Sequence, residues 1–349
     1  MSNQRYRYPL MALAFAILTA AAWGGLLRLG WAWPALQPTL PVRHGPLMVA
    51  GFFGTLIAIE RAVALGKAWA YSSPLLSSIG GLLVALGLGG QMGPVLMALG
   101  SSWLVLIFAV ILRQHRTGYM LVMALGAVAL LVGNLLWLFG IPVFQFVLWW
   151  AGFLILTIAG ERLELGRMAR QSKFSRVAFA FATTIFLAGL VILLPAWDLG
   201  VRLAGTAMIL LGLWLLRFDI ARRTVKQTGL TRFIAVCLLS GYVWLLVSGS
   251  IALIYGAVPA GPVYDAMLHA IFLGFVFSMI FGHAPIIFPA VLGIAIEYKP
   301  YFYFPLILLH ISLVVRISGE LLGSSPARQW GGLFNVIAVI LYLGMLALR

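Results

Sequence analysis

The stretch Gly118–Gly140, GYMLVMALGAVALLVGNLLWLFG, decides the class of fold because it carries no charged residue. A helix of about 20 apolar residues crosses the hydrocarbon core of a bilayer, whereas a membrane strand needs about 10 residues and would alternate. The chain repeats this pattern: 63% of its 349 residues are hydrophobic and 9% are charged, with a mean hydropathy of +1.08. Soluble domains carry about 25% charged residues. We therefore predict an all-α, polytopic membrane protein.

Twelve apolar runs long enough to cross a bilayer follow one another along the chain. The connections between them are short, so neighbouring spans should be antiparallel, and we expect residues 1–349 to form a single polytopic membrane domain. The predicted spans are approximately Tyr8–Trp31, Pro41–Leu65, Pro74–Gln91, Pro94–Leu112, Gly118–Gly140, Pro142–Leu165, Val177–Leu194, Leu199–Leu216, Thr231–Tyr255, Pro262–Pro289, Tyr301–Leu321 and Gly331–Leu348.

Lysine and arginine predict the orientation in the membrane. With the N-terminus inside, all but five of the 23 basic residues fall in inner segments such as RMARQSKFSR, so we expect a multi-pass protein of the inner membrane with both termini cytoplasmic. The net charge of +15 is spread over these loops, which favours contact with membrane lipids and not with nucleic acid. The five exceptions are Arg28, Arg43, Arg202, Arg316 and Arg328.

Four histidines lie within predicted spans, where ionisable groups are costly and mark functional sites. Both His44 and His269 begin spans that run from outside to inside, so the two should lie at a similar depth in the outer leaflet. His283 follows His269 on the same face of one helix but about 21 Å deeper, and His310 lies in the next span. One prosthetic group could therefore bind His44 and His269, but not His269 and His283.

Two neutral imidazoles on opposite sides of an iron satisfy a low-spin haem and make an electron-transfer site. We therefore predict haem b ligated by His44 and His269. Asp265, four residues before His269, could accept the second ring N–H of that histidine. The alternative is that a membrane histidine only hydrogen-bonds a neighbouring helix. The remaining predicted haem contacts are Gly45, Gly51 and Gly274 as space, Met48 as an apolar wall, and Arg28, Arg43 and Arg328 as cations for the propionates.

A second group of polar residues falls in the inner half. His283 and His310 could bind copper or zinc with a carboxylate, relay protons, or satisfy neighbouring backbone groups. Arg316 and Glu320, spaced i, i+4 in the eleventh span, should form an internal ion pair.

Two stretches carry a family resemblance. HGPLMVAGFF, from His44, resembles the second helix of the haem–copper oxidase catalytic subunit, and HAIFLGFVFSMIFGHAPIIFP, from His269, resembles its tenth. The resemblance implies a pseudo-threefold bundle of twelve helices, low-spin haem ligation by the two histidines, and Arg328 near the propionates in the loop before the last span. In length and sparse histidines the chain is also similar to NnrS-like membrane proteins, which are linked to haem, copper and nitric oxide stress.

A weak internal repeat favours the threefold arrangement. GFFGTLIAIERAVALG, from Gly51, parallels GFLILTIAGERLELG, from Gly152. The alternative is that a helix end with Glu-Arg recurs by chance, each glutamate neutralising its neighbouring arginine.

The chain departs from the oxidase pattern at the catalytic centre. Spans six and seven contain no histidine, and Met267 stands where the family has a haem ligand two residues before His269. We therefore expect a haem protein without the binuclear oxygen-reducing site, acting with a redox partner protein as an oxidoreductase component, or handling or sensing a diatomic gas such as nitric oxide. The alternative function is a proton or metal-ion transporter that uses the membrane histidines and acids without haem.

Overall fold

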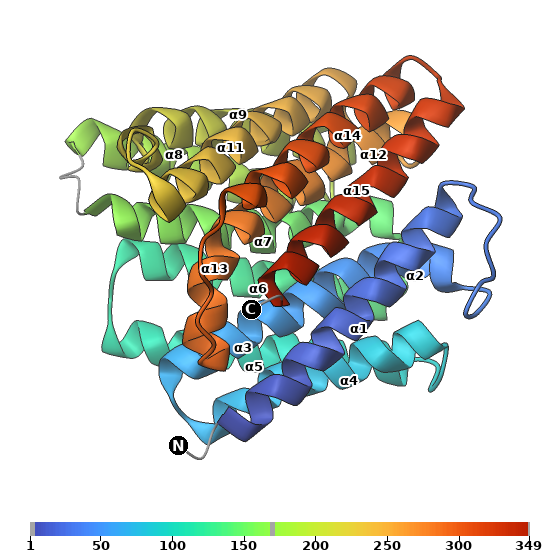
Figure 1. Cartoon of the computed structure of the whole chain (residues 1–349), viewed down its shortest axis with the longest axis horizontal. Coiled ribbons are helices and arrows are strands. Elements are labelled where there is room, and N and C mark those ends of the chain that lie inside the picture. Colours follow the sequence, from blue (N-terminus) through green and yellow to red (C-terminus); the bar gives the residue numbers. More distant parts are fainter. Residues whose placement is uncertain (1–3, 168–171, 348–349) are drawn as a thin grey trace. The chain divides into compact units, whose positions relative to one another are not determined.

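Helices make up the regular secondary structure of the computed structural model, which describes residues 4–167 and 172–347 (Figure 1). The predicted cytoplasmic residues Arg170 and Arg349 lie outside the described residues. The α-helices are α1 (Gln4–Arg28), α2 (Leu40–Pro46), α3 (Gly54–Leu65), α4 (Ser72–Leu86), α5 (Met92–Gln114), α6 (Gly118–Leu138), α7 (Val143–Gly166), α8 (Lys173–Ile192), α9 (Trp197–Phe218), α10 (Ala221–Thr224), α11 (Gly229–Tyr255), α12 (Pro262–His269), α13 (Ser278–Leu292), α14 (Tyr303–Leu321) and α15 (Ser325–Ala347). The π-helices are η1 (Leu47–Phe53) and η4 (Ala270–Phe277), and the 3₁₀-helices are η2 (Ala68–Tyr71) and η5 (Pro300–Phe302).

Twelve helical stretches of the described residues are long and apolar enough to cross a membrane. They correspond one to one to the twelve predicted spans, and no strand interrupts them in the part of the chain that the structure describes. The prediction of an all-α protein with twelve candidate spans is therefore confirmed, and the chain has the build of a multi-pass membrane protein.

Two α-helix boundaries differ from those predicted by five residues or more. Helix α4 ends at Leu86 and not at Gln91, because Gly87 adopts a φ of 71°, the left-handed conformation that closes a helix. Helix α15 begins at Ser325 and not at Gly331, since Pro326 is well suited to a first helical turn. Arg328, which we expected in a loop, therefore lies in the first turn of α15, and that prediction was wrong.

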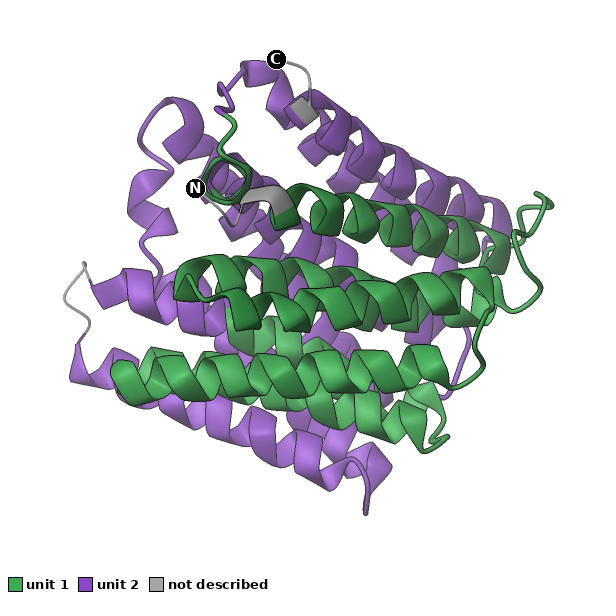
Figure 2. Cartoon of the chain, turned by 90° about the horizontal axis from the view of Figure 1, so that it is seen from below, with its two compact units in different colours: residues 1–157, 287–294 green, residues 158–286, 295–349 purple. Residues whose placement is uncertain are grey.

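The chain divides into two compact units, coloured separately in Figure 2. Unit 1 comprises Met1–Thr157 and Ile287–Ile294, and unit 2 comprises Ile158–Ile286 and Ala295–Arg349. The boundaries fall within α7, within α13 and just after α13, between Ile294 and Ala295. The single membrane domain that we expected stays a prediction, and each unit is described by itself.

Unit 1 is built on close approaches between helices. Helix α4 packs against α5, α5 packs against α6, and α1 lies against α2, η1 and α4. A Cβ atom on Gly81 of α4 would lie 3.3 Å from the Cα of Gly51 in η1. Asn134 of α6 donates to the hydroxyl of Ser101 on α5 at 3.1 Å and accepts from the indole N–H of Trp150 on α7 at 2.9 Å. Small residues and interhelical hydrogen bonds of this kind hold membrane helices together.

Unit 2 follows the same rules. Helix α9 packs against α8 and α11, α14 packs against α15 and α12, and η4 contacts α11 and α14. A Cβ atom on Gly331 of α15 would lie 2.7 Å from the backbone nitrogen of Arg316 on α14, so the glycine permits close packing at this point. The amide of Asn335 and the hydroxyl of Ser312 lie 2.6 Å apart between the same two helices. Arg316 is thereby enclosed where α14 and α15 meet.

A buried ion pair in unit 2 was missed by sequence analysis. The guanidinium of Arg162, at the end of α7, donates to both carboxylate oxygens of Asp219 at 2.6 and 2.9 Å, and the two side chains are 3% and 0% exposed. Asp219 also accepts from the hydroxyl of Tyr242 at 3.1 Å and from the backbone N–H of Ala221 at 2.6 Å. Arg162 thus bonds Asp219, a partner that the alternative of simple Glu161–Arg162 neutralisation does not include.

Arg61 and Arg202 also form ion pairs with acidic residues close to them in the sequence. Arg61 pairs with its neighbour Glu60 at 2.7 Å, as the alternative reading of the repeat expects. Arg202, one of the outer-face exceptions, pairs with Asp198 at 2.7 Å and donates to the carbonyl of Leu253 at 2.6 Å. It closes the C-terminal end of α11, where backbone carbonyls lack helical partners.

Candidate functional site

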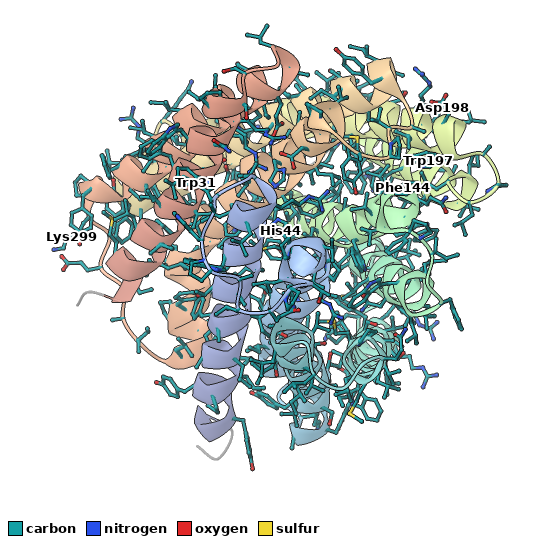
Figure 3. All side chains as sticks on the ribbon, turned by 90° about the vertical axis from the view of Figure 1, so that its right-hand side faces the viewer. Trp31, His44, Phe144, Trp197, Asp198 and Lys299 are labelled. Carbon is teal, nitrogen blue, oxygen red and sulfur yellow. The ribbon has the colours of Figure 1, made fainter. Side chains whose placement is uncertain are left out.

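His44 lies in the last turn of α2 and is held against α1. Its Nδ1 lies 2.6 Å from the carbonyl oxygen of Ala21, and because a carbonyl only accepts, Nδ1 carries the proton. A Cβ atom on Gly25 would lie 2.8 Å from the Cε1 of the ring, so this glycine allows the ring to lie against the helix. Figure 3 labels His44 beside the first helix. In this tautomer the lone pair is on Nε2, the usual atom for axial ligation.

His269 ends α12 and has a matching arrangement. Its Nδ1 donates to the carbonyl oxygen of Asp265 at 2.9 Å and lies 3.3 Å from the Oδ1 of the same residue. The four-residue spacing predicted this contact. The lone pair of His269 is again on Nε2, and a carbonyl or carboxylate on the second nitrogen fixes the orientation of metal-binding histidines in general.

A π-helix follows each of these two histidines. Residues Leu47–Phe53 form η1, three residues after His44, and Ala270–Phe277 form η4 immediately after His269. π-helices are rare and frequently occur at functional sites. Pro46 has no N–H to donate and gives η1 a local cause, whereas η4 contains no proline. The two histidines therefore share a side-chain tautomer and an unusual helical context.

A buried cluster of charges adjoins His269 in unit 2. The Nη2 of Arg316 lies 2.6 Å from the Oδ2 of Asp265, and its Nε lies 3.2 Å from the Oε1 of Glu320. The side chains of Arg316 and Glu320 are 6% and 0% exposed. The predicted Arg316–Glu320 pair is confirmed. Asp265 also bonds Arg316, a contact that the sequence did not predict. The Oε2 of Glu320 is buried and has no hydrogen-bond partner among the described residues.

His310 and His283 each bond neighbouring groups, and a second metal site at these two histidines stays a prediction. The Nδ1 of His310 accepts from the indole N–H of Trp244 at 2.9 Å, and its Nε2 lies 2.9 Å from the hydroxyl of Ser240, so both ring nitrogens are used. His283 donates from Nδ1 to the carbonyl of Met279 at 2.7 Å. Across the described ranges no group of three histidine, cysteine or acidic residues could hold a metal ion. The structure therefore favours the alternative that these histidines satisfy neighbouring groups.

The three predicted pocket glycines have different surroundings. A Cβ atom on Gly45 would meet no atom within 4 Å, so this residue borders open space. A Cβ atom on Gly51 would lie 2.9 Å from Ile17, and one on Gly274 would overlap the indole of Trp244. Protein side chains fill the space beside the latter two, which serve helix packing in this structure.

The other predicted residues are distributed over both units. Met48 is half-buried in η1, and Arg28 is exposed at the end of α1. The guanidinium of Arg43 lies 3.5 Å from the carbonyl oxygen of Val84, a weak contact. The Nε of Arg328 is buried and lacks a hydrogen-bond partner in the part of the chain described.

The two candidate haem ligands belong to different units. His44 is in unit 1, and His269 is in unit 2 with Asp265 and Arg328. The structure defines the surroundings of each histidine, and their pairing stays a prediction.

Fold and site together define the class: an all-helical protein with twelve candidate membrane spans and four histidines within them. The chain belongs to the family described as a domain of unknown function, DUF8744, whose sequence model matches residues 7–349. No curated protein and no solved structure matches it.

Proposed function

We propose that this protein is a b-type haem-binding integral membrane protein in which His44 and His269 are the two axial ligands. The observation that carries the proposal is the matched local structure of these residues. Each ring has Nδ1 bound to a backbone carbonyl, and each precedes a π-helix. Of the four histidines in the spans, His310 is excluded as a ligand in its present state because both of its ring nitrogens are used.

The surrounding residues support this role to different degrees. Gly45 borders open space beside one ligand, and the buried Nε of Arg328 lacks a hydrogen-bond partner among the described residues, as a propionate-binding arginine would before its ligand arrives. We propose Arg28 and Arg43 as further propionate contacts and Asp265 as the group that orients His269. A haem with two imidazole ligands supplies one-electron transfer. The function is therefore electron transfer with a redox partner, or the sensing or handling of a diatomic gas such as nitric oxide.

An absorption spectrum of the purified protein, oxidised and then reduced with dithionite, tests the proposal. We expect a low-spin b-type spectrum that is lost in His44→Ala and in His269→Ala. His283→Ala is the matched control, since it lies in the same span as His269 with its Nδ1 on Met279, and it should keep the spectrum. A protein that is colourless both in the membrane and after purification refutes the proposal, as does a spectrum that survives both ligand substitutions.

We further propose that the twelve spans adopt the pseudo-threefold arrangement of the haem–copper oxidase subunit, without its binuclear centre. Spans two and ten are eight spans apart, as two steps of a four-helix repeat require, and each contains a π-helix after a histidine. Spin labels on α2 and α12 would test this: the proposal requires their outer ends to be neighbours, and a distance spanning the whole protein would contradict it.

We also propose an inner-membrane location with both termini cytoplasmic. An even number of candidate spans brings the two termini to one side, and the distribution of lysine and arginine selects that side. A C-terminal green fluorescent protein fusion should fluoresce, while an alkaline phosphatase fusion at the same point should be inactive. The opposite pair of results would reverse the orientation.

Transport of protons or metal ions without haem is the second candidate function. The observation that favours it is the cluster of Asp265, Arg316 and Glu320. A buried carboxylate oxygen without a hydrogen-bond partner among the described residues lowers the stability of the fold, and ionisable groups kept inside a membrane protein at such a cost mark functional sites. Proteoliposomes loaded with a pH-sensitive dye would decide between the candidates. Proton flux in a colourless protein, lost in Glu320→Gln, would select the transporter and exclude the haem protein.

A further inference from the structure

A groove lies on unit 1 where α5 ends and α6 begins, and it has a volume of about 540 Å³. Its apolar part is lined by Ala109 and Leu112 of α5 and by Leu121 of α6, and its polar end is lined by Arg113 in the last turn of α5 and by residues of the connecting turn. The groove is therefore apolar along the helices and polar where they end.

The polar end is positively charged. Arg113 and Arg116 line it and are exposed, and neither guanidinium pairs with another described residue. No acidic residue lines the groove. Arginines such as Arg162 and Arg316 are by contrast satisfied by carboxylates. The groove thus contains two positively charged groups that have no anionic partner among the described residues.

The turn presents further donors at the same place. Thr117 precedes α6 in an extended conformation, but its hydroxyl caps no backbone N–H, and its Oγ1 is buried without a hydrogen-bond partner among the described residues. A Cβ atom on the next residue, Gly118, would meet nothing within 4 Å. The first N–H groups of a helix lack internal partners and favour anions. An anionic group at this point would therefore meet two guanidinium groups and the start of α6.

We propose that this groove binds an anionic phospholipid, with the phosphate at Arg113, Arg116 and the start of α6 and an acyl chain along the apolar part. A free phosphate would bind only at the polar end of the groove. A zwitterionic lipid would bring its own positive charge close to the two arginines. The turn between α5 and α6 belongs to the face where we expect the cytoplasmic leaflet, which carries the anionic lipids. This binding is independent of haem and of the two candidate histidines.

Native mass spectrometry of the full-length protein tests the proposal, with phosphatidylglycerol and phosphatidylcholine of identical acyl chains as probes. We expect phosphatidylglycerol to be retained preferentially. A basic residue near the membrane surface contributes about 1 kcal/mol, or about fivefold, so Arg113→Gln with Arg116→Gln should weaken retention about thirtyfold. Exchange of Arg223 and Lys226 for glutamine is the matched control, since both are exposed on or next to α10 outside the groove, and it should change retention less than threefold.

A second substitution separates the groove from the charge. Ala109→Phe fills the apolar part without removing a cation and should lower retention of phosphatidylglycerol at least tenfold. Equal retention of the two lipids by the native protein would overturn the proposal. So would displacement of phosphatidylglycerol by millimolar inorganic phosphate, which would assign the site to a free anion, or an equal loss in the control variant, which would reduce the effect to general surface charge.

Discussion

Replacing Asp219 by asparagine should strongly destabilise unit 2. The substitution keeps the size of the side chain and removes its charge, so the buried guanidinium of Arg162 loses the carboxylate that it bonds. Asp198→Asn is the matched control. It breaks an Asp–Arg pair in the same unit whose side chains, Arg202 and Asp198, are 40% and 58% exposed.

The expected difference follows from burial. Removing one partner of a buried pair costs about 3–5 kcal/mol because the remaining charge stays desolvated, whereas an exposed pair contributes about 0.2–1 kcal/mol. A unit of this size shifts its melting temperature by about 2–4 °C for each kcal/mol. Asp219→Asn should therefore lower the melting temperature by on the order of 10 °C, and Asp198→Asn by at most about 4 °C.

The chain supplies its own reporter for the measurement. Cys237 is the sole cysteine and is fully buried on α11, the helix that carries Tyr242 of the Asp219 network. A thiol-reactive dye that fluoresces on coupling should follow unfolding of unit 2 as the temperature rises. Equal shifts in the two variants, or no shift in Asp219→Asn, would refute the reasoning that the Arg162 charge is held in a desolvated site.

Two further predictions concern the histidines. Gly25→Ala should displace the His44 ring, since its Cβ would lie 2.8 Å from Cε1, and we expect about 1–3 kcal/mol lower stability. Gly45→Ala, which meets no atom within 4 Å, should stay within about 0.5 kcal/mol of the native protein; equal effects in heat denaturation would contradict the contact. Trp244→Phe removes the donor to His310 and should cost about 1–3 kcal/mol, measured with the same thiol dye; an unchanged melting temperature would argue against that bond.

The sequence predicted what is local and apolar. Hydropathy gave all twelve spans because a bilayer imposes one length on each helix. Turns between spans were less certain. The end of α4 depends on the left-handed conformation of Gly87, and the start of α15 depends on Pro326. Each of these effects comes from a single residue, whereas hydropathy is averaged over a window of about 20 residues.

Within the site, the sequence predicted contacts between residues of one helix but not contacts between residues of different helices. The pairs Arg316–Glu320 and Asp265–His269 are each separated by four residues, so the helical period predicts them. The Arg316–Asp265 contact joins α14 to α12. Hydropathy does not specify which spans are neighbours, and for this reason the sequence alone could not predict it.

The π-helices escaped prediction for a different reason. Residues 270–277 are uniformly apolar, so their sequence has no polar face whose period could distinguish one helical geometry from another.

The two π-helices also determine the directions in which the side chains on either side of them point around the helix axis. In an α-helix one residue turns the chain by about 100°, so a wider turn that holds an extra residue rotates everything beyond it. The direction of His44 relative to α3 is therefore set by the number of residues in Leu47–Phe53 and not only by their identity. Deleting one residue there would keep the span apolar and long enough to cross the membrane, yet it would change the direction of the histidine relative to α3. Residue count in η1 and η4 is thus itself a determinant of where the two rings point.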